Sequence, residues 1–398
     1  MTARAASGPA SNVAVMRTRD GLRLQTQALP PLPPDGMRFR MLRAAVCGTD
    51  RQIVRGDRPD AASVLGHEGV AEVAAVGAAV RGQSRFWAEG DRVVFNPVNP
   101  HDQDEILGHS YDGLFQRYFV ASAGELARRA LLVLAPAALA PELCVLAEPL
   151  GTVLYTHELV QRAAAPRSWL VIGAGPVGIL HALHAARLPH APRVRIVCNS
   201  EQRARWLVRR GIAAARDVVR WSPDDAAARD VAAGGAPDLV LACTPARAAP
   251  AAIEFAAAVV ADSGHIGLIG GAGGRASAAL PGVDLVAVRR TNACGVTAPG
   301  AAAAVGATTA AGRTVFVFGQ RGTAPRHLQA ALTLLAKAPD YARVLTHRVA
   351  LAALPEALAA IADGRPLAGE PCVKAVVDCT RDDAAIELFG SPGPGAGP

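Results

Sequence analysis

The sequence predicts an α/β protein of two domains, in which a β-rich region precedes a doubly wound parallel sheet. Three observations support this prediction. The chain has 398 residues, more than one ordinary hydrophobic core accommodates. From residue 38 to about residue 133, short apolar runs alternate with Gly and Pro, as in an all-β unit. After residue 165, strand-like and helix-like segments alternate, which is typical of a parallel sheet with crossover helices.

The predicted parallel sheet starts with SWLVIGAG, a strand that enters a Gly-rich turn, and continues into the apolar helix PVGILHALHAARL. Strand, helix, strand, helix and strand then follow as VRIVC, EQRARWLVRRG, DLVLACT, APAAIEFAAAVV and HIGLIGG. We place the first domain at 1–165, the parallel-sheet domain at 166–318, and a return of the chain to the first domain at 319–398. Residues 1–12 and the tail from about residue 390 are expected to be mobile. The Ala/Gly-rich stretch 298–312 is of low complexity and has no assigned element.

Composition limits the classes of partner. Lys and Arg exceed Asp and Glu by 41 − 34 = 7, but the arginines are scattered, which argues against a nucleic-acid partner. The seven cysteines have no short paired spacing and do not form a disulfide framework. The N-terminus has no apolar core of a secretory signal, and no run of about 18 apolar residues offers a membrane span. We therefore expect a cytoplasmic protein without a membrane segment.

The Gly-rich turn Gly173-Ala174-Gly175-Pro176-Val177-Gly178 follows a predicted strand and opens a predicted helix. In such a turn the first Gly allows the tight bend, the second lets the backbone approach a pyrophosphate, and the third lets helix pack on strand. The free N–H groups of the helix N-terminus then bind the pyrophosphate. The alternative is an ordinary glycine turn, but strand, turn and helix together favour a dinucleotide site.

The end of the second strand bears on the choice between NAD and NADP. An NAD-selective site places Asp or Glu about 20 residues after the turn, where it binds the ribose hydroxyls. Here 178 + 20 = 198, and the residues are Cys198, Asn199 and Ser200, followed by Arg203 and Arg205. The sequence therefore predicts that a 2′-phosphate is tolerated and held by these arginines, unless they only coat an exposed helix.

Three short motifs contain residue types that bind a catalytic zinc ion. They are Cys47-Gly48-Thr49-Asp50, then Gly66-His67-Glu68-Gly69 with 67 − 47 = 20 residues between Cys and His, and Ala147-Glu148-Pro149-Leu150. Thiolate, imidazole and carboxylate are ligands of catalytic zinc, which keeps a fourth position open. Each residue alone has a structural explanation, as a core thiol, a loop histidine or a charge at a helix N-terminus. Their joint occurrence ahead of a cofactor turn favours a metal site.

CGTD, GHEG, GDRVV, the EPL element and GAGPVG, in this order over residues 35 to 380, resemble the zinc-dependent medium-chain alcohol and polyol dehydrogenases. CGTDRQIVRG, the PVN at 97–99, the HSYDG at 109–113 and the GQ at 319–320 are most similar to the archaeal-type glucose dehydrogenases. The resemblance implies a GroES-like catalytic domain, a Rossmann-type domain, an active site in the cleft between them, and a homodimer or homotetramer.

The resemblance also implies roles for particular residues. Cys47, His67 and Glu148 match the ligands of one catalytic zinc, Glu68 the adjacent carboxylate, and Thr49 the hydroxyl that takes the alcohol proton. Asn99 and Glu105 match positions that contact sugar hydroxyls. For the cofactor we expect contacts from Asn199, Ser200 and Arg203 at the end of the second strand, and from Asn292.

The chain departs from the family pattern at several positions. The four cysteines of the family's structural-zinc lobe are absent from 96–111, so we expect no structural zinc. Gln52 stands where simple alcohol dehydrogenases have a relay histidine, leaving water or Asp50 for proton exit. Arg290 and Phe318 replace two further sugar-contacting residues.

We therefore expect an NAD(P)-dependent zinc dehydrogenase of an aldose or cyclitol. The alternatives are a zinc dehydrogenase of a non-sugar alcohol, a zinc-free quinone or enoyl reductase, and a non-catalytic cofactor-binding protein on the same fold.

Overall fold

The computed structural model describes residues 9–390, except 84–86, 162–164, 222–229 and 232. The chain folds into two compact units. The first comprises Met1–Ala147, Leu332–Lys337 and Leu345–Pro398, and the second comprises Glu148–Ala331 and Ala338–Val344. This is the predicted α/β class, with a β-rich unit that the chain leaves and re-enters.

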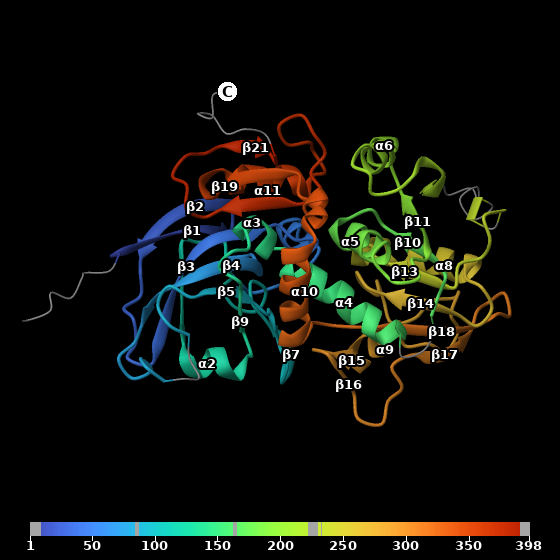
Figure 1. The fold of residues 1–398 in the computed structure, drawn as a ribbon, viewed down its shortest axis with the longest axis horizontal. Coiled ribbons are helices and arrows are strands. Elements are labelled where there is room, and N and C mark those ends of the chain that lie inside the picture. Colours follow the sequence, from blue (N-terminus) through green and yellow to red (C-terminus); the bar gives the residue numbers. More distant parts are fainter. Residues whose placement is uncertain (1–8, 84–86, 162–164, 222–229, 232, 391–398) are drawn as a thin grey trace, which may run out of the picture. The chain divides into compact units, whose positions relative to one another are not determined.

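The first unit is built on an eight-stranded sheet. Its order is β21-β19-β20-β3-β4-β5-β9, with β8 also paired to β3 (Figure 1). The strands are β3 (Gly36–Ala45), β4 (Glu68–Val76), β5 (Arg92–Phe95), β8 (Tyr118–Ser122), β9 (Leu132–Leu134), β19 (His347–Ala350), β20 (Ala375–Asp378) and β21 (Ile386–Leu388). Two hairpins, β1 (Ser11–Thr18) with β2 (Gly21–Ala28) and β6 (Val98–Asn99) with β7 (Asp102–Ile106), and the helices α1 (Gly48–Val54), α2 (Ala123–Arg128), α3 (Pro141–Cys144) and α11 (Leu354–Ala362) complete it.

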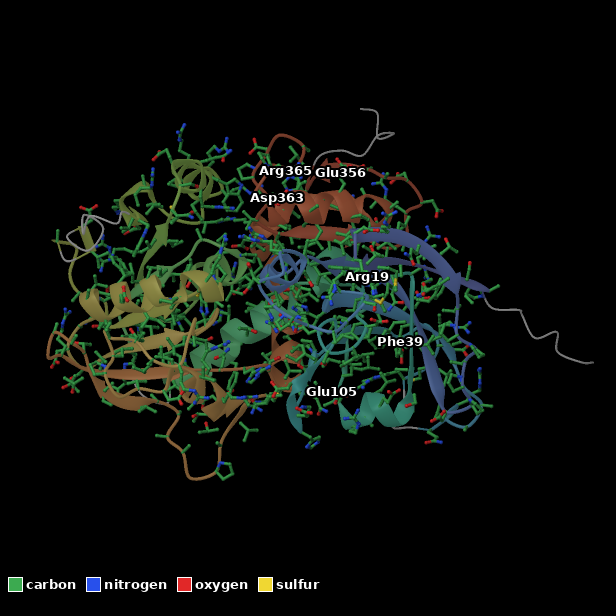
Figure 2. All side chains as sticks on the ribbon, turned by 180° about the vertical axis from the view of Figure 1, so that it is seen from behind. Arg19, Phe39, Glu105, Glu356, Asp363 and Arg365 are labelled. Atoms are coloured by element: carbon green, nitrogen blue, oxygen red, sulfur yellow. The ribbon has the colours of Figure 1, made fainter. Side chains whose placement is uncertain are left out.

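The core of this unit contains a group of packed aromatic rings. Phe39, which is labelled in Figure 2, packs edge-on against Phe95 with ring centroids 5.9 Å apart, and Phe119 completes the aromatic group. Alternating apolar residues of β3 and β4 point into this core because successive side chains of a strand face opposite sides. The apolar alternation in the sequence of these strands therefore reflects which side chains face the core.

The second unit contains a seven-stranded sheet of order β12-β11-β10-β13-β14-β18-β17. All strands run parallel except β17, which is antiparallel to β18. The strands are β10 (Ser168–Ile172), β11 (Arg193–Cys198), β12 (Val218–Arg220), β13 (Leu239–Ala242), β14 (Gly264–Leu268), β17 (Val305–Thr308) and β18 (Thr314–Gly319). In the described part of the chain its α-helices are α4 (Ala147–Gln161), α5 (Pro176–Ala185), α6 (Glu201–Arg209), α8 (Ala249–Val259), α9 (Leu285–Thr291) and α10 (Pro325–Lys337), of which residues Leu332–Lys337 are assigned to the first unit.

The strand order of this sheet determines where a ligand can bind. The chain turns from β10 outward to β11 and β12, and then crosses back to β13 on the other side of β10. This reversal is the switch point of a doubly wound sheet, and ligands bind there at the carboxyl ends of the strands. The Gly-rich turn at 173–178 directly follows β10 and so lies at this point.

Two sequence expectations change in detail. Residues 1–8 and 391–398 lie outside the described part of the chain, but residues 9–12 are not the mobile segment that we expected. Strand β1 begins at Ser11, and Asn12 is buried. Its side-chain amide donates to Gln116 Oε1 and to the carbonyl of Tyr118, and these bonds fix the start of the strand. The unassigned stretch 298–312 contains β17, which forms the edge of the parallel sheet.

In the described part of the chain, no helix combines the length and apolarity that a membrane crossing requires.

Candidate metal centre and cofactor turn

Cys47 is held at the junction between β3 and α1, where it is the N-cap residue of the helix. Its backbone N–H donates to Asp50 Oδ2 at 2.8 Å, so the third residue of the helix closes back on the cap. The half-buried sulfur lies 3.8 Å from Thr49 Oγ1. The CGTD motif is therefore a helix cap that presents a thiol and a hydroxyl side by side.

His67 precedes β4 directly and is almost fully buried. Gly66 before it has φ = +91°, a conformation that glycine adopts readily, and a Cβ there would lie 2.7 Å from the ring of Phe115. The glycine of GHEG thus allows the bend that turns the imidazole towards the cysteine.

The structure brings Cys47, His67 and Glu68 together. One ligand atom of each lies within 4.8 Å of the others, while ligands of one tetrahedral zinc ion are about 3–4 Å apart. Nδ1 of His67 has no hydrogen-bond partner among the described residues, although it faces Asp50 Oδ1 at 4.0 Å. A thiol, an imidazole and a carboxylate converging in a buried place form a donor set that fits a zinc ion.

The electrostatics of this cluster also favour a cation. Burial opposes the charged imidazolium, but the adjacent Cys47 sulfur and the carboxylates of Asp50 and Glu68 outweigh it and raise the pKa of His67 to about 10. For Asp50, burial disfavours the carboxylate and raises its pKa above the ordinary value. The Cys47 sulfur and the carboxyl groups of Asp50 and Glu68 therefore surround His67 at one buried point, where a positive charge is stabilised.

Glu68 has a partner that the motif did not reveal. Its carboxylate contacts Nζ of Lys374, and both side chains are buried. The same Nζ donates to the carbonyl of Val46 at 3.1 Å, one residue before Cys47. Lys374 on the C-terminal segment therefore links the two stretches of chain that carry the cysteine and the histidine.

Glu148, the remaining predicted ligand, is the second residue of α4 and is half-buried. It belongs to the second unit, whereas Cys47, His67 and Glu68 belong to the first. Its role as a zinc ligand stays a prediction.

The cofactor turn has the geometry that its glycines predict. Gly173 has φ = +112°, and a Cβ on it would lie 2.7 Å from the carbonyl oxygen of Cys243. A Cβ on Gly178 would lie 2.0 Å from the carbonyl oxygen of Gly173, so α5 and the turn are in close contact. A Cβ on Gly175, the N-cap of α5, would meet nothing within 4 Å. The turn therefore leaves open space beside the helix N-terminus, where a pyrophosphate fits.

The end of β11 has no carboxylate, as its sequence indicates. Asn199 and Ser200 are exposed, and Ser200 Oγ accepts from the backbone N–H of Arg203 as the cap of α6. Glu201 comes next, but its carboxylate pairs with Arg205 at 3.3 Å and contacts Arg220 at the end of β12. Arg220 adds a cation that the sequence analysis did not consider, because it is adjacent to Cys198 only through strand pairing.

The two predicted sugar-contacting residues lie together in the first unit. Asn99 Nδ2 donates to Glu105. Both carboxylate oxygens of Glu105 accept from Arg128, and Oε1 also accepts twice from Arg129. These hydrogen bonds lower the pKa of Glu105, the one from Arg128 most. Figure 2 shows Glu105 beside α2, the helix that carries Arg128.

Asn292, Phe318 and Arg290, which the sequence analysis also named, lie in the second unit. Asn292 is fully buried, and its amide group donates to the carbonyls of Ala303 and Gly319 and accepts from Thr297 Oγ1. Phe318 is buried in the core of the same unit, whereas Arg290 is exposed. The side chain of Asn292 therefore has a structural role here, and contact with a cofactor stays a prediction.

The sequence analysis missed Lys374 and attached no role to His109, whose ring lies against His67. Lys374 gave a signal, because a lysine within the apolar run VKAVVD is unusual unless it is paired. His109 gave none, since its contact depends on how a turn folds back.

Comparison with known proteins agrees with this description. Residues 33–130 match the family described as alcohol dehydrogenase GroES-like domain. The chain is 34% identical over 178 residues to glucose 1-dehydrogenase of Thermoproteus tenax, covering 40% of this chain and 50% of that protein. It is 26% identical over 230 residues to L-threonine 3-dehydrogenase of Cutibacterium acnes, covering 52% and 63%. The matches thus span about half to three-fifths of these relatives.

Among solved structures, 2R,3R-butanediol dehydrogenase from Bacillus subtilis superposes with a TM-score of 0.65 at 20% identity, covering 92% of this chain and 99% of that one. This likeness shows a shared fold. The chain combines a GroES-like unit that holds a Cys/His/Glu cluster with a parallel-sheet unit that holds a glycine turn. The chain is thus similar to alcohol and polyol dehydrogenases, and its residues 33–130 match their GroES-like domain.

Proposed function

We propose that the chain is a zinc-dependent dehydrogenase that transfers hydride between a secondary or hemiacetal alcohol of an aldose or cyclitol and NAD(P). The observation that carries this proposal is the buried cluster of Cys47, His67 and Glu68 in a chain that also contains an open glycine turn. A zinc-free reductase of the same fold has no need of this donor set, and a non-catalytic relative would be expected to lose it.

In this proposal each group has a defined task. Cys47 and His67 hold the metal, with Glu148 as the third ligand, and the bound zinc acts as a Lewis acid that lowers the pKa of the substrate hydroxyl. Thr49, next to Cys47, accepts the hydroxyl proton. The glycine turn and the N-terminus of α5 hold the pyrophosphate, so that the nicotinamide can be placed against the substrate carbon.

Measuring the zinc content and the dehydrogenase activity of the purified protein tests this proposal. We expect one zinc per chain and turnover of an alcohol with a nicotinamide cofactor. Cys47→Ser should lose the metal and reduce turnover at least a thousandfold, while circular dichroism stays that of the wild type. Active protein without zinc would instead support the zinc-free reductase, and zinc-bound protein that oxidises no alcohol would support a binding role. Two zincs per chain would contradict the expected single site.

We further propose that NADP is accepted at least as well as NAD. The end of β11 lacks a carboxylate, and Arg203 and Arg220 supply positive charge nearby. Asn199→Asp should shift the ratio of kcat/KM towards NAD, because the carboxylate repels a 2′-phosphate and binds the ribose hydroxyls. A wild-type preference for NAD above a hundredfold, about 2.7 kcal/mol, would contradict this proposal.

One observation favours a second candidate substrate. Because Glu105 already accepts from two arginines and Asn99, a sugar hydroxyl would have to share or displace these contacts. A non-sugar secondary alcohol needs no such exchange, and several relatives are named L-threonine 3-dehydrogenase.

A substrate panel separates the two candidates. Values of kcat/KM for aldoses, inositols, L-threonine, 2,3-butanediol and ethanol should be compared in wild type and Glu105→Ala. The polyol proposal predicts that polyols are preferred and that Glu105→Ala selectively reduces their turnover. Preference for L-threonine or a simple diol would support the second candidate.

The family resemblance also leads us to propose a homodimer or homotetramer, which light scattering of the purified protein tests.

A further inference from the structure

A tight turn at 106–113 lies against the segment that leads into His67. The turn is internally fixed, since the backbone N–H groups of His109 and Ser110 donate to the carbonyl of Ile106 and Ser110 Oγ accepts from the N–H of Ile106. Gly108, with φ = +72°, supplies the bend. The resulting loop has little freedom to move independently of its neighbours.

Backbone hydrogen bonds dock this turn onto residues 62–66. The carbonyl of His109 accepts from Ala62 at 2.8 Å, and the carbonyl of Val64 accepts from Gly113 at 2.7 Å. Asp112 Oδ1 accepts from the N–H groups of Ser63 and Val64 at 2.8 and 2.9 Å.

The approach is close enough to require glycine on the turn side. A Cβ on Gly113 would lie 2.1 Å from the carbonyl oxygen of Gly66, and one on Gly108 would lie 2.5 Å from it. The segment that leads into His67 is thus closely packed against the turn.

The turn places one side chain directly on the metal-binding imidazole. The rings of His109 and His67 are 4.8 Å apart between centroids, with an interplanar angle of 83°, and both side chains are buried. Edge-to-face contacts of this kind fix the relative orientation of two rings. Partners that orient a metal-binding histidine, mostly through hydrogen bonds to its other ring nitrogen, typically alter metal affinity 10–100-fold when they are mutated.

We propose that His109 is a positioning residue, whose ring holds the imidazole of His67 in the orientation that binds the metal. This inference rests on the proposed zinc site, and it gives a role to the first residue of the HSYDG motif, for which the family resemblance implied none. The contact is made by the face and edge of the rings, so the role belongs to ring shape and not to ligation by His109.

The test compares His109→Ala and His109→Phe with wild type, and uses His101→Ala as the control, since His101 is an exposed histidine of the neighbouring hairpin. Zinc affinity is measured by competition with a chromophoric chelator, and the site geometry by the visible absorption bands of the Co²⁺-substituted protein. Circular dichroism verifies the fold of each variant.

We expect His109→Ala to weaken zinc binding roughly 10–100-fold and to shift the cobalt bands, and His109→Phe to restore both within about threefold. His101→Ala should match the wild type. If His109→Ala binds zinc as tightly as wild type, the inference is wrong while the zinc site stands. If His109→Phe is as weak as His109→Ala, ring packing is not the cause and the inference is also wrong. If wild-type protein binds no metal, the proposed function itself fails.

Discussion

At the scale of single residues, the candidate metal site depends on charges that are buried together. Cys47, His67, Asp50 and Glu68 converge at one point, and Lys374 contacts Glu68 from a distant part of the sequence. A buried ion pair stabilises little beyond what its desolvation costs, but an unpaired buried charge is strongly destabilising. The site is therefore sensitive to the loss of either partner.

Lys374→Met should lower the free energy of unfolding by about 3–5 kcal/mol, because it leaves the carboxylate of Glu68 buried without its cation. Chemical denaturation of the metal-free protein measures this difference.

The double variant Lys374→Met with Glu68→Gln is the matched control for that prediction. It removes both charges and should recover at least half of the lost stability. If the double variant is as unstable as Lys374→Met alone, the cost comes from lost packing of the lysine stem and not from the unpaired charge.

At the scale of elements, the turn between β10 and α5 contains glycines with two different roles, one in the fold and one in ligand binding. Gly178 is required by the fold, since a Cβ there would lie 2.0 Å from the carbonyl oxygen of Gly173. Gly175 has open space around its Cβ position and φ = −85°, which any residue adopts. The fold alone does not require a glycine there, so its presence fits a ligand that approaches the backbone.

Gly178→Ala should reduce both the midpoint of thermal unfolding and cofactor binding. Gly175→Ala should keep the wild-type unfolding midpoint within about 2 °C but weaken binding of NADP and NAD at least tenfold, because the methyl group obstructs the pyrophosphate. Thermal unfolding and fluorescence titration measure the two effects. Unchanged cofactor affinity in Gly175→Ala would contradict the assignment of this turn.

Charged side chains attach the hairpin of β6 and β7 to the rest of its unit. The sequence 96–111 has no cysteine where the family has its structural-zinc lobe. In the structure, Glu105 joins this hairpin to Arg128 and Arg129 of the α2 region, and Arg129 lies 4.0 Å over the ring of Tyr111. Ionic and cation–π contacts thus hold this segment to the body of its unit.

At the scale of the whole molecule, stability should depend on pH through buried neutral histidines in the second unit. His181 and His184 of α5 lie near His157 of α4, and His184 Nδ1 is 3.2 Å from the hydroxyl of Tyr341. Burial lowers the pKa of His181 to about 3 and that of His184 to about 4. The nearby positive charge of Arg187 also disfavours protonation of His184.

The direction of the effect follows from these values. Both histidines are neutral in the folded chain and titrate near 6.5 when unfolded, so their contribution is complete above pH 6.5. As the pH falls from 6.5 towards 4, the unfolded chain takes up protons that the folded chain does not. Stability then falls by at most about 1.4 kcal/mol per pH unit for each histidine.

The slope of the thermal midpoint between pH 6.5 and 4.5 measures this effect. His181→Gln with His184→Gln should flatten the slope, whatever the absolute midpoint at neutral pH, whereas His190→Gln, at an exposed position, should leave it unchanged. An equal slope in wild type and the double variant would show that other groups cause the acid sensitivity.

Much of the fold follows from local patterns in the sequence. Apolar alternation predicted the strands of the first unit, and the order of strand and helix segments predicted the parallel sheet of the second, because side-chain periodicity reflects which face is buried. The bend at Gly173 and the close packing at Gly178 were also predicted, since they depend on residues adjacent in the chain. Residues 298–312 could not be assigned, because the short edge strand Val305–Thr308, of sequence VGAT, lacks a buried face to mark it.

The sequence by itself determined which residue types could form the site, namely the cysteine of CGTD, the histidine and glutamate of GHEG, and the glycines of the cofactor turn. Only the tertiary structure decided their partners. Lys374 contacts Glu68, which lies 306 positions away in the sequence, and the ring of His109 packs on that of His67 through a folded-back turn. Arg128 and Arg129 donate hydrogen bonds to Glu105. Local propensity and periodicity act over a few residues, whereas the partner of a buried charge or ring depends on which distant segments the packed core brings together.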